Sequence, residues 1–152
     1  MQKKFRSKSA CVEFFNSLTK VFIPGDIIFF NGDLGVGKTF FAKQIIMNLT
    51  SDIFVTSPTF NLVNTYLTRN GIEVWHCDFF RLSDISEIQE LGVFDDMYKK
   101  IIILEWPKFV RKFSIDPIVI EVKFGKTTYE RILNLTFSKN WNCRLEFLKN
   151  KS

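Results

Sequence analysis

Apolar positions in the first third of the chain follow two different spacings. Residues 26–30 (DIIFF) form a continuous apolar run, which is typical of a strand in a buried parallel sheet. Residues 39–49 (TFFAKQIIMNL) have helical spacing, and so does an earlier segment that Ser7 or Ser9 can cap and that the Pro-Gly pair at 24–25 ends. The apolar positions of this earlier segment are Cys11, Phe14, Phe15, Leu18 and Phe22. We therefore predict helix, strand and helix in this order.

Strand patterns dominate the middle of the chain. They cover residues 52–60 (DIFVTSPTF), 61–68 (NLVNTYLT) and 72–80 (IEVWHCDFF). The first is expected to end at its Ser-Pro-Thr triplet, and the last two are expected to form a hairpin because Asn70-Gly71 is a strong turn signal. Residues 83–91 (SDISEIQEL) have the pattern of a capped helix that starts at Ser83.

The last third contains one buried strand pattern and two alternating ones. Residues 100–106 (KIIILEW) hold four aliphatic side chains followed by an acid. Residues 117–125 (PIVIEVKFG) and 130–138 (ERILNLTFS) alternate, and residues 141–150 (WNCRLEFLKN) favour a helix. Because no internal repeat or linker is evident, we expect one α/β domain over residues 1–152.

The composition is that of a globular protein, with 46% hydrophobic and 24% charged residues. The 18 phenylalanines fit core positions, since protein cores accept Phe, Leu and Ile with repacking. The net charge is +5, but lysines and arginines are scattered along the chain. A solvated basic surface and contacts with an acidic partner or an RNA therefore both stay open.

The three cysteines, Cys11, Cys77 and Cys143, are widely separated. Their odd number and spacing fit neither a zinc site nor a disulfide framework, which favours a reducing compartment. Glu13 interrupts the apolar pattern near the start, so a signal peptide is not expected, and no stretch approaches the ~20 apolar residues needed to cross a membrane. We expect a soluble, cytoplasmic protein with no membrane partner.

A glycine-rich loop separates the strand at 26–30 from the helix at 39–49. The stretch NGDLGVGKT matches the phosphate-loop pattern, with Gly32, Gly37, Lys38 and Thr39 at its fixed positions. Its N–H groups and the helix N-terminus favour phosphate, Lys38 supplies a charge for the terminal phosphates, and the Thr39 hydroxyl can ligate Mg²⁺. We predict nucleotide contacts from Asp33, Leu34, Gly35, Val36, Gly37, Lys38, Thr39 and Phe40.

Hydrolysis or transfer of phosphate also needs an acid near the metal. Asp78 and Glu105 each end an apolar strand pattern, and either one can hold Mg²⁺ or position the attacking water. Thr59, in the Ser-Pro-Thr triplet, can sense the γ-phosphate and metal. Lys38, Thr59, Asp78 and Glu105 are therefore the candidate catalytic group, with Thr39, Asp78 and Glu105 toward the metal. No Asn-Lys-x-Asp motif for guanine is present, which favours ATP over GTP.

Four motifs in order, NGDLGVGKT, SPTFNLVNTY, HCDFFR and LEWP, resemble those of the bacterial TsaE (YjeE) ATPases over residues 9–107. The resemblance implies a P-loop NTPase fold with a mainly parallel central sheet, flanking helices and an antiparallel portion. It implies ATP and Mg²⁺ at the residues above, with Trp106 packing near the nucleotide or partner. His76 and Arg81 match the His-x-Asp-x-x-Arg motif, and for His76 a structural role is favoured over catalysis.

The same resemblance implies a weak ATPase that acts with the TsaB–TsaD pair in tRNA threonylcarbamoyladenosine modification. ATP turnover would reset TsaD, which transfers the threonylcarbamoyl group to the adenosine beside the anticodon, so tRNA contact is expected to be indirect. Two positions depart from the family pattern. Phe80 stands where a tyrosine is usual, and Phe40 stands where a small polar residue is common.

Two other functions stay open at this point. A P-loop kinase for a small molecule would need an acceptor pocket and lid arginines, and neither is evident in the sequence. A nucleotide-gated binding module without turnover would require that Asp78 and Glu105 take no part in catalysis. The separate duties of Asp78 and Glu105, and the residues that contact the adenine, are not indicated by any motif.

Overall fold

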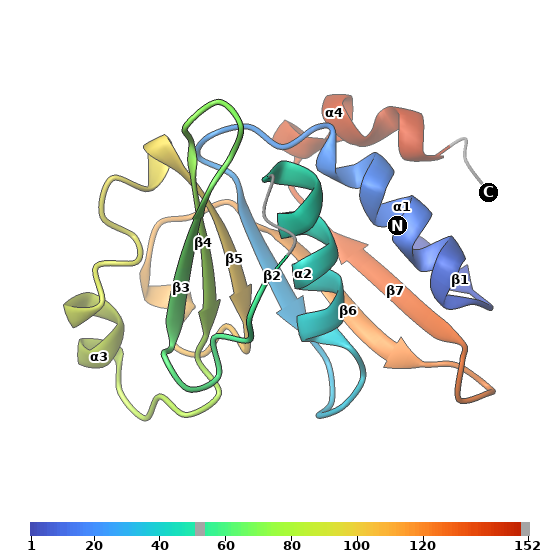
Figure 1. The fold of residues 1–152 in the computed structure, drawn as a ribbon, viewed down its shortest axis with the longest axis horizontal. Coiled ribbons are helices and arrows are strands. Elements are labelled where there is room, and N and C mark those ends of the chain that lie inside the picture. Colours follow the sequence, from blue (N-terminus) through green and yellow to red (C-terminus); the bar gives the residue numbers. More distant parts are fainter. Residues whose placement is uncertain (51–53, 150–152) are drawn as a thin grey trace.

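A seven-stranded mixed sheet with helices on both faces organises the chain in the computed structural model, which describes residues 1–50 and 54–149 (Figure 1). The strands are β1 (Gln2–Phe5), β2 (Ile27–Asn31), β3 (Val63–Leu67), β4 (Glu73–Asp78), β5 (Lys100–Glu105), β6 (Ile118–Phe124) and β7 (Arg131–Thr136). The helices are α1 (Lys8–Thr19), α2 (Lys38–Leu49), α3 (Ile85–Glu90) and α4 (Lys139–Lys149), with 3-10 turns at Met97–Lys99 and Val110–Lys112. No helix in these two ranges is long and apolar enough to cross a membrane.

The strand order is β1-β7-β6-β2-β5-β4-β3, with parallel strands in the centre. β2 pairs in parallel with β5 and β6, and β4 pairs in parallel with β5. The outer pairs β3–β4, β6–β7 and β1–β7 are antiparallel. The predicted α/β fold with a parallel centre and an antiparallel portion is confirmed, and the antiparallel strands lie on both sides of the parallel ones.

The central strands end together at one edge of the sheet, called the carboxyl edge below. In the register, Glu105 of β5 lies beside both Phe30 of β2 and Asp78 of β4. Every residue of β5 is buried, as are Ile27–Phe30 of β2, because helices cover both faces of a parallel sheet. The chain therefore brings the glycine loop and the two predicted acids to the same edge.

Two hydrophobic cores lie on opposite faces of the sheet. Alternate residues of β5 divide between them, since successive side chains of a strand point to opposite faces. Ile101 and Ile103 belong to the core beneath α1, α2 and α4, whereas Ile102 and Leu104 belong to the core that includes Ile88 of α3. Glu105 follows Ile103 on the first face, so its side chain lies on the same side of the sheet as α2.

Several predicted elements are confirmed, two expectations need correction, and one strand was not expected. The β3–β4 hairpin, β2, β5 and α2 lie where the hydrophobic pattern placed them. β1 was not predicted. No strand forms over residues 54–60, where the chain is irregular and then turns, and positions 52 and 53 of that predicted strand lie outside the described residues. The second correction concerns α3, which is capped by Asp84 and not by Ser83.

Candidate nucleotide and metal site

The glycine loop connects the end of β2 to the start of α2 at the carboxyl edge (Figure 1). Gly35 and Gly37 adopt left-handed backbone angles, with φ of 76° and 107°, which few other residues tolerate. Gly37 is the N-cap of the 12-residue helix α2 and no side chain caps it. The first turn of a helix has N–H groups without intrahelical partners, so this end of α2 suits a phosphate.

Lys38 lies buried beneath the loop with its side chain folded toward the backbone. Its Nζ donates to the carbonyl oxygens of Gly32 and Asp33, both at 2.8 Å, and lies 3.7 Å from the centroid of the Trp106 ring. Burial lowers the pKa of Lys38, while the charges of Glu105, Asp78 and Asp33 oppose that shift. The contacts of this ammonium are two neutral carbonyls and a ring face, and it forms no salt bridge with any of the described residues. Its charge is therefore suited to an anion in the loop.

Glu105 connects the loop helix to the neighbouring strand β4. The Thr39 hydroxyl donates to Oε2 of Glu105 at 2.7 Å, and Nε2 of His76 lies 2.8 Å from Oε1. Thr39 is in the first turn of α2 and His76 is in β4, so two elements hold one carboxylate. Both His76 and Glu105 are buried. The predicted neighbourhood of Thr39 and Glu105 is thus present as a direct hydrogen bond.

Asp78 forms a second contact with the Ser-Pro-Thr triplet. The Thr59 hydroxyl donates to Oδ2 of Asp78 at 3.0 Å, and the Ser57 and Thr59 hydroxyls are 2.8 Å apart. The N–H of Phe80 donates to Oδ1 of Asp78 at 2.9 Å, which fixes the carboxylate at the strand end. The structure therefore places Thr59 beside Asp78 at the same edge as Glu105. These side-chain contacts occur in the irregular segment that replaces the predicted strand.

The oxygen donors at this edge fit a magnesium ion that a nucleotide also coordinates. Mg²⁺ usually takes one or two carboxylates together with substrate phosphates and water. Thr39, Asp78 and Glu105 supply one hydroxyl and two carboxylates here. In the part of the chain that the structure describes, no group of three or more His, Cys, Asp and Glu side chains could hold a metal without such help. The residues present fit a metal–nucleotide pair better than a metal alone.

Trp106 follows Glu105 and turns its ring back over the loop lysine. Its φ of 55° is left-handed, which is uncommon for a bulky residue, and its N–H donates to the Phe30 carbonyl at 3.2 Å. The Phe80 ring packs against the Trp106 ring with centroids 4.9 Å apart. Lys108 donates to the Phe80 carbonyl. The Phe80 ring thus supports the Trp106 ring at the carboxyl edge.

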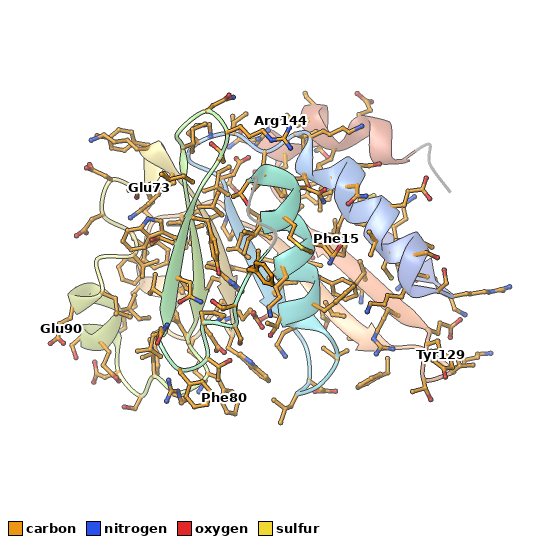
Figure 2. The ribbon with its side chains drawn as sticks, in the orientation of Figure 1. Phe15, Glu73, Phe80, Glu90, Tyr129 and Arg144 are labelled. Carbon is orange, nitrogen blue, oxygen red and sulfur yellow. The ribbon has the colours of Figure 1, made fainter. Side chains whose placement is uncertain are left out.

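A cavity of about 320 Å³ lies beside the loop, on the side of the β6–β7 turn. Phe40, a predicted contact, lines it, as do Lys8, Tyr129 and Arg131, which no motif indicated. Arg131 also donates to the Val36 carbonyl at 2.9 Å. The Leu34 side chain is absent from this lining and is exposed at the loop tip. Figure 2 shows Tyr129 in the turn between β6 and β7, far from the ends of β4. The lining of this cavity therefore combines residues from distant parts of the chain.

The sheet order and the loop between β2 and α2 define the class, a P-loop NTPase fold. The fold resembles the crystal structure of YdiB from Bacillus subtilis with a TM-score of 0.75, covering 99% of this chain and 95% of that one at 20% identity. The family described as threonylcarbamoyl adenosine biosynthesis protein TsaE matches residues 5–133, and the chain belongs to this family.

Individual relatives agree with the family match. The tRNA threonylcarbamoyladenosine biosynthesis protein TsaE of Rickettsia felis is 39% identical over 128 residues, which is 83% of this chain and 74% of that protein. The protein of the same name from Borreliella burgdorferi is 35% identical over 136 residues, which is 88% of each chain. The resemblance seen in the four sequence motifs is therefore confirmed at the level of the family.

Proposed function

We propose that the chain is a Mg²⁺-dependent ATPase that serves as an accessory protein in the N6-threonylcarbamoyladenosine modification of tRNA. The observation that carries this proposal is the contact between Thr39 and Glu105 beneath the glycine loop, with Asp78 in the adjacent register position. A loop that only bound phosphate would not need two buried acids at its base. Family membership supports the tRNA modification context.

The contacts divide the proposed roles between the two acids. Glu105 accepts from Thr39, so it acts on the metal side of the site. Asp78 accepts from Thr59, so it acts with the Ser-Pro-Thr segment that responds to the γ-phosphate and orients the attacking water. Lys38 binds the terminal phosphates from beneath the loop. Bound Mg²⁺ would neutralise charge on the β- and γ-phosphates.

The cavity beside Gly37 is the proposed place of the nucleoside. Phe40 and Tyr129 provide ring faces, and Lys8 and Arg131 provide cations near the same space. Aromatic walls and a few polar groups are typical of small-molecule sites. The expected nucleotide remains ATP.

The proposed partners are TsaB and TsaD, with tRNA reached through their complex. Exposed apolar side chains surround the site at the carboxyl edge, which is typical of a surface that a protein partner covers. They are Leu34, Phe60, Phe80 and Phe109. The described cysteines, Cys11, Cys77 and Cys143, are free thiols, which accords with the proposed cytoplasmic location.

The deciding experiment measures ATP hydrolysis by this protein alone and with the TsaB–TsaD pair and tRNA. We expect stimulation by the complex and its loss in Lys38→Ala. We also expect Asp78→Asn to lower turnover by roughly 10²- to 10⁴-fold, the range for groups that act on the reacting proton or water, and Glu105→Gln to lower turnover through its effect on the metal. Nucleotide affinity should change less, because the loop and Lys38 bind the phosphates.

Three outcomes would contradict the proposal. A preference for GTP would exclude the ATPase as stated. Phosphate transfer to a metabolite without partners would favour the kinase alternative. Full activity of Glu105→Gln and Asp78→Asn in the assembled complex would favour a binding module without turnover.

A further inference from the structure

We propose that His76 is a positioning residue that fixes the orientation of the Glu105 carboxylate. This inference rests on the proposed function, because it assigns His76 a part in the same reaction. Among the residues that the structure describes, the His76 side chain forms a hydrogen bond to Glu105 and none to the glycine loop. It would therefore act on turnover through Glu105.

The register of the sheet creates this contact. His76 in β4 lies beside Ile103 of β5, two residues before the Asp78–Glu105 pair. Residues two apart in a strand share a face, so His76, Asp78 and Glu105 all lie on the face that α2 covers. The His76 side chain is completely buried there. A buried imidazole at this position can reach the carboxylate without entering the nucleotide site.

The chemistry of the pair assigns the proton. A carboxylate oxygen only accepts hydrogen bonds, so Nε2 of His76 carries the hydrogen and donates to Oε1 of Glu105. Nδ1 of His76 is buried and has no hydrogen-bond partner within the described ranges. An unpaired buried polar atom costs roughly 1–3 kcal/mol. An apolar side chain of similar size would avoid that cost, so packing alone does not account for a histidine here.

The two hydrogen bonds on Glu105 act together. The terminal torsion of a glutamate is broad, so a carboxylate held at one oxygen can still rotate. His76 holds Oε1 at 2.8 Å, and this leaves Oε2 directed at the Thr39 hydroxyl at 2.7 Å. Without His76, Glu105 would lose the partner that fixes the rotation of its carboxylate plane. Positioning partners of this kind are common behind groups that bind metal ions.

The test compares His76→Leu with His76→Gln in the full protein, assayed with TsaB, TsaD and tRNA. Glutamine can present an N–H near the position of Nε2, whereas leucine cannot. We expect His76→Leu to lower kcat by about 10- to 100-fold, as loss of such partners does, and to leave KM for ATP within about three-fold. His76→Gln should recover most of the lost kcat. Urea unfolding of both variants identifies any loss of folded protein.

A second comparison separates positioning from general damage. In a Glu105→Gln background, His76→Leu should cause little further loss of turnover, because its route of action is already removed. Equal kcat for His76→Leu and the wild type would overturn the proposal. So would a fully additive loss in the double variant, or the same loss in folded His76→Gln and His76→Leu.

The tautomer gives a readout that needs no activity. Nitrogen-15 NMR of the histidine ring should show a proton on Nε2, and an Nε2 without a proton would overturn the inference. This result distinguishes the two proposals. If the wild type shows no Lys38-dependent hydrolysis with its partners, the proposed function fails, and the ring signal still decides whether His76 donates to Glu105.

Discussion

Gly32 and Gly35 lie three residues apart in the loop, but the space around them differs. At Gly32, φ is 133°, and an added Cβ would lie 2.2 Å from the Val122 carbonyl oxygen. At Gly35, φ is 76° and no heavy atom lies within 4 Å of an added Cβ. The first position demands glycine for both backbone angle and close approach, and the second for backbone angle alone.

We expect Gly32→Ala to destabilise the protein more than Gly35→Ala. A left-handed alanine costs about 1–2 kcal/mol, which is the expected loss for Gly35→Ala. Gly32→Ala adds a backbone clash to a Gly-only angle, so roughly 3 kcal/mol or more is expected. Urea unfolding, followed by circular dichroism, measures both. Equal losses, or a larger loss for Gly35→Ala, would show that the close approach of β6 to the loop does not limit position 32.

The sequence motifs identified the loop residues but not their partners. Lys38 and Thr39 could be assigned because the phosphate-loop pattern is local, and Asp78 and Glu105 because each ends an apolar run. The bond between His76 and Glu105 joins residues 29 apart and depends on the register of β4 against β5. The Trp106 ring over Lys38 depends on a left-handed backbone that no composition rule indicates. Contacts of this kind require the tertiary structure.

At the level of elements, the C-terminal helix α4 is bound to the turn before β2 by hydrogen bonds and an ion pair. Arg144 of α4 donates to both oxygens of Asp26, at 2.7 and 2.9 Å, and also to the Val21 carbonyl at 3.0 Å. Its guanidinium lies over the Trp141 ring at 4.2 Å. Figure 2 shows Arg144 near the end of the molecule opposite Phe80, far from the proposed site. Its contribution should therefore be to stability.

Arg144→Ala should lower the free energy of unfolding by roughly 2–3 kcal/mol, because it leaves the buried Asp26 carboxylate without its cation. The expected loss of unfolding free energy is smaller than for a fully buried ion pair, since the Arg144 side chain is 26% exposed. Arg144→Lys keeps the charge but loses the bidentate geometry. Its free energy of unfolding should therefore lie between those of Arg144→Ala and the wild type. The exposed pair Lys99–Asp96 offers a control, and Lys99→Ala should change the free energy of unfolding much less, because solvent screens an exposed ion pair. Equal effects of Arg144→Ala and Lys99→Ala in urea unfolding would contradict this prediction.

The elements that the hydrophobic pattern predicted are those with the strongest patterns. β2 and β5 are continuous apolar runs, and both are central. β1 (QKKF) has three polar residues in four and is placed by its pairing with β7 and by Phe5 packing against Phe14, so its own pattern carries little signal. The segment before β3 has strand-like residues, but Thr59 bonds to Asp78 and Leu62 donates back to the Pro58 carbonyl, which turns the chain. Tertiary contacts overrode the local preference there.

For the whole molecule, exposed aromatic side chains lie at both ends of the parallel strands. At the carboxyl edge, Phe60 is 87% exposed and directly follows Thr59, and its carbonyl accepts from Arg81 at 2.7 Å. Phe80 lies at the same edge, and Figure 2 shows it at the opposite end of β4 from Glu73. At the other edge, Tyr98 is 64% exposed in the 3-10 turn that precedes β5. The proposed partner surface is the carboxyl edge. A substitution of Phe60 therefore tests this surface, and a substitution of Tyr98 at the other edge is its matched control.

Phe60→Ser should weaken stimulation by the TsaB–TsaD pair while the hydrolysis of ATP by the isolated protein stays unchanged. An aromatic residue at the centre of an interface is often worth more than about 1.4 kcal/mol, so the partner concentration for half-maximal stimulation should rise about ten-fold. Tyr98→Ser removes a similar exposed ring from the opposite edge and should leave that concentration unchanged. A titration of each variant with the partner pair at saturating ATP measures the effect. If Tyr98→Ser shifts the titration and Phe60→Ser does not, the partners bind the amino-terminal edge, away from Thr39 and Glu105.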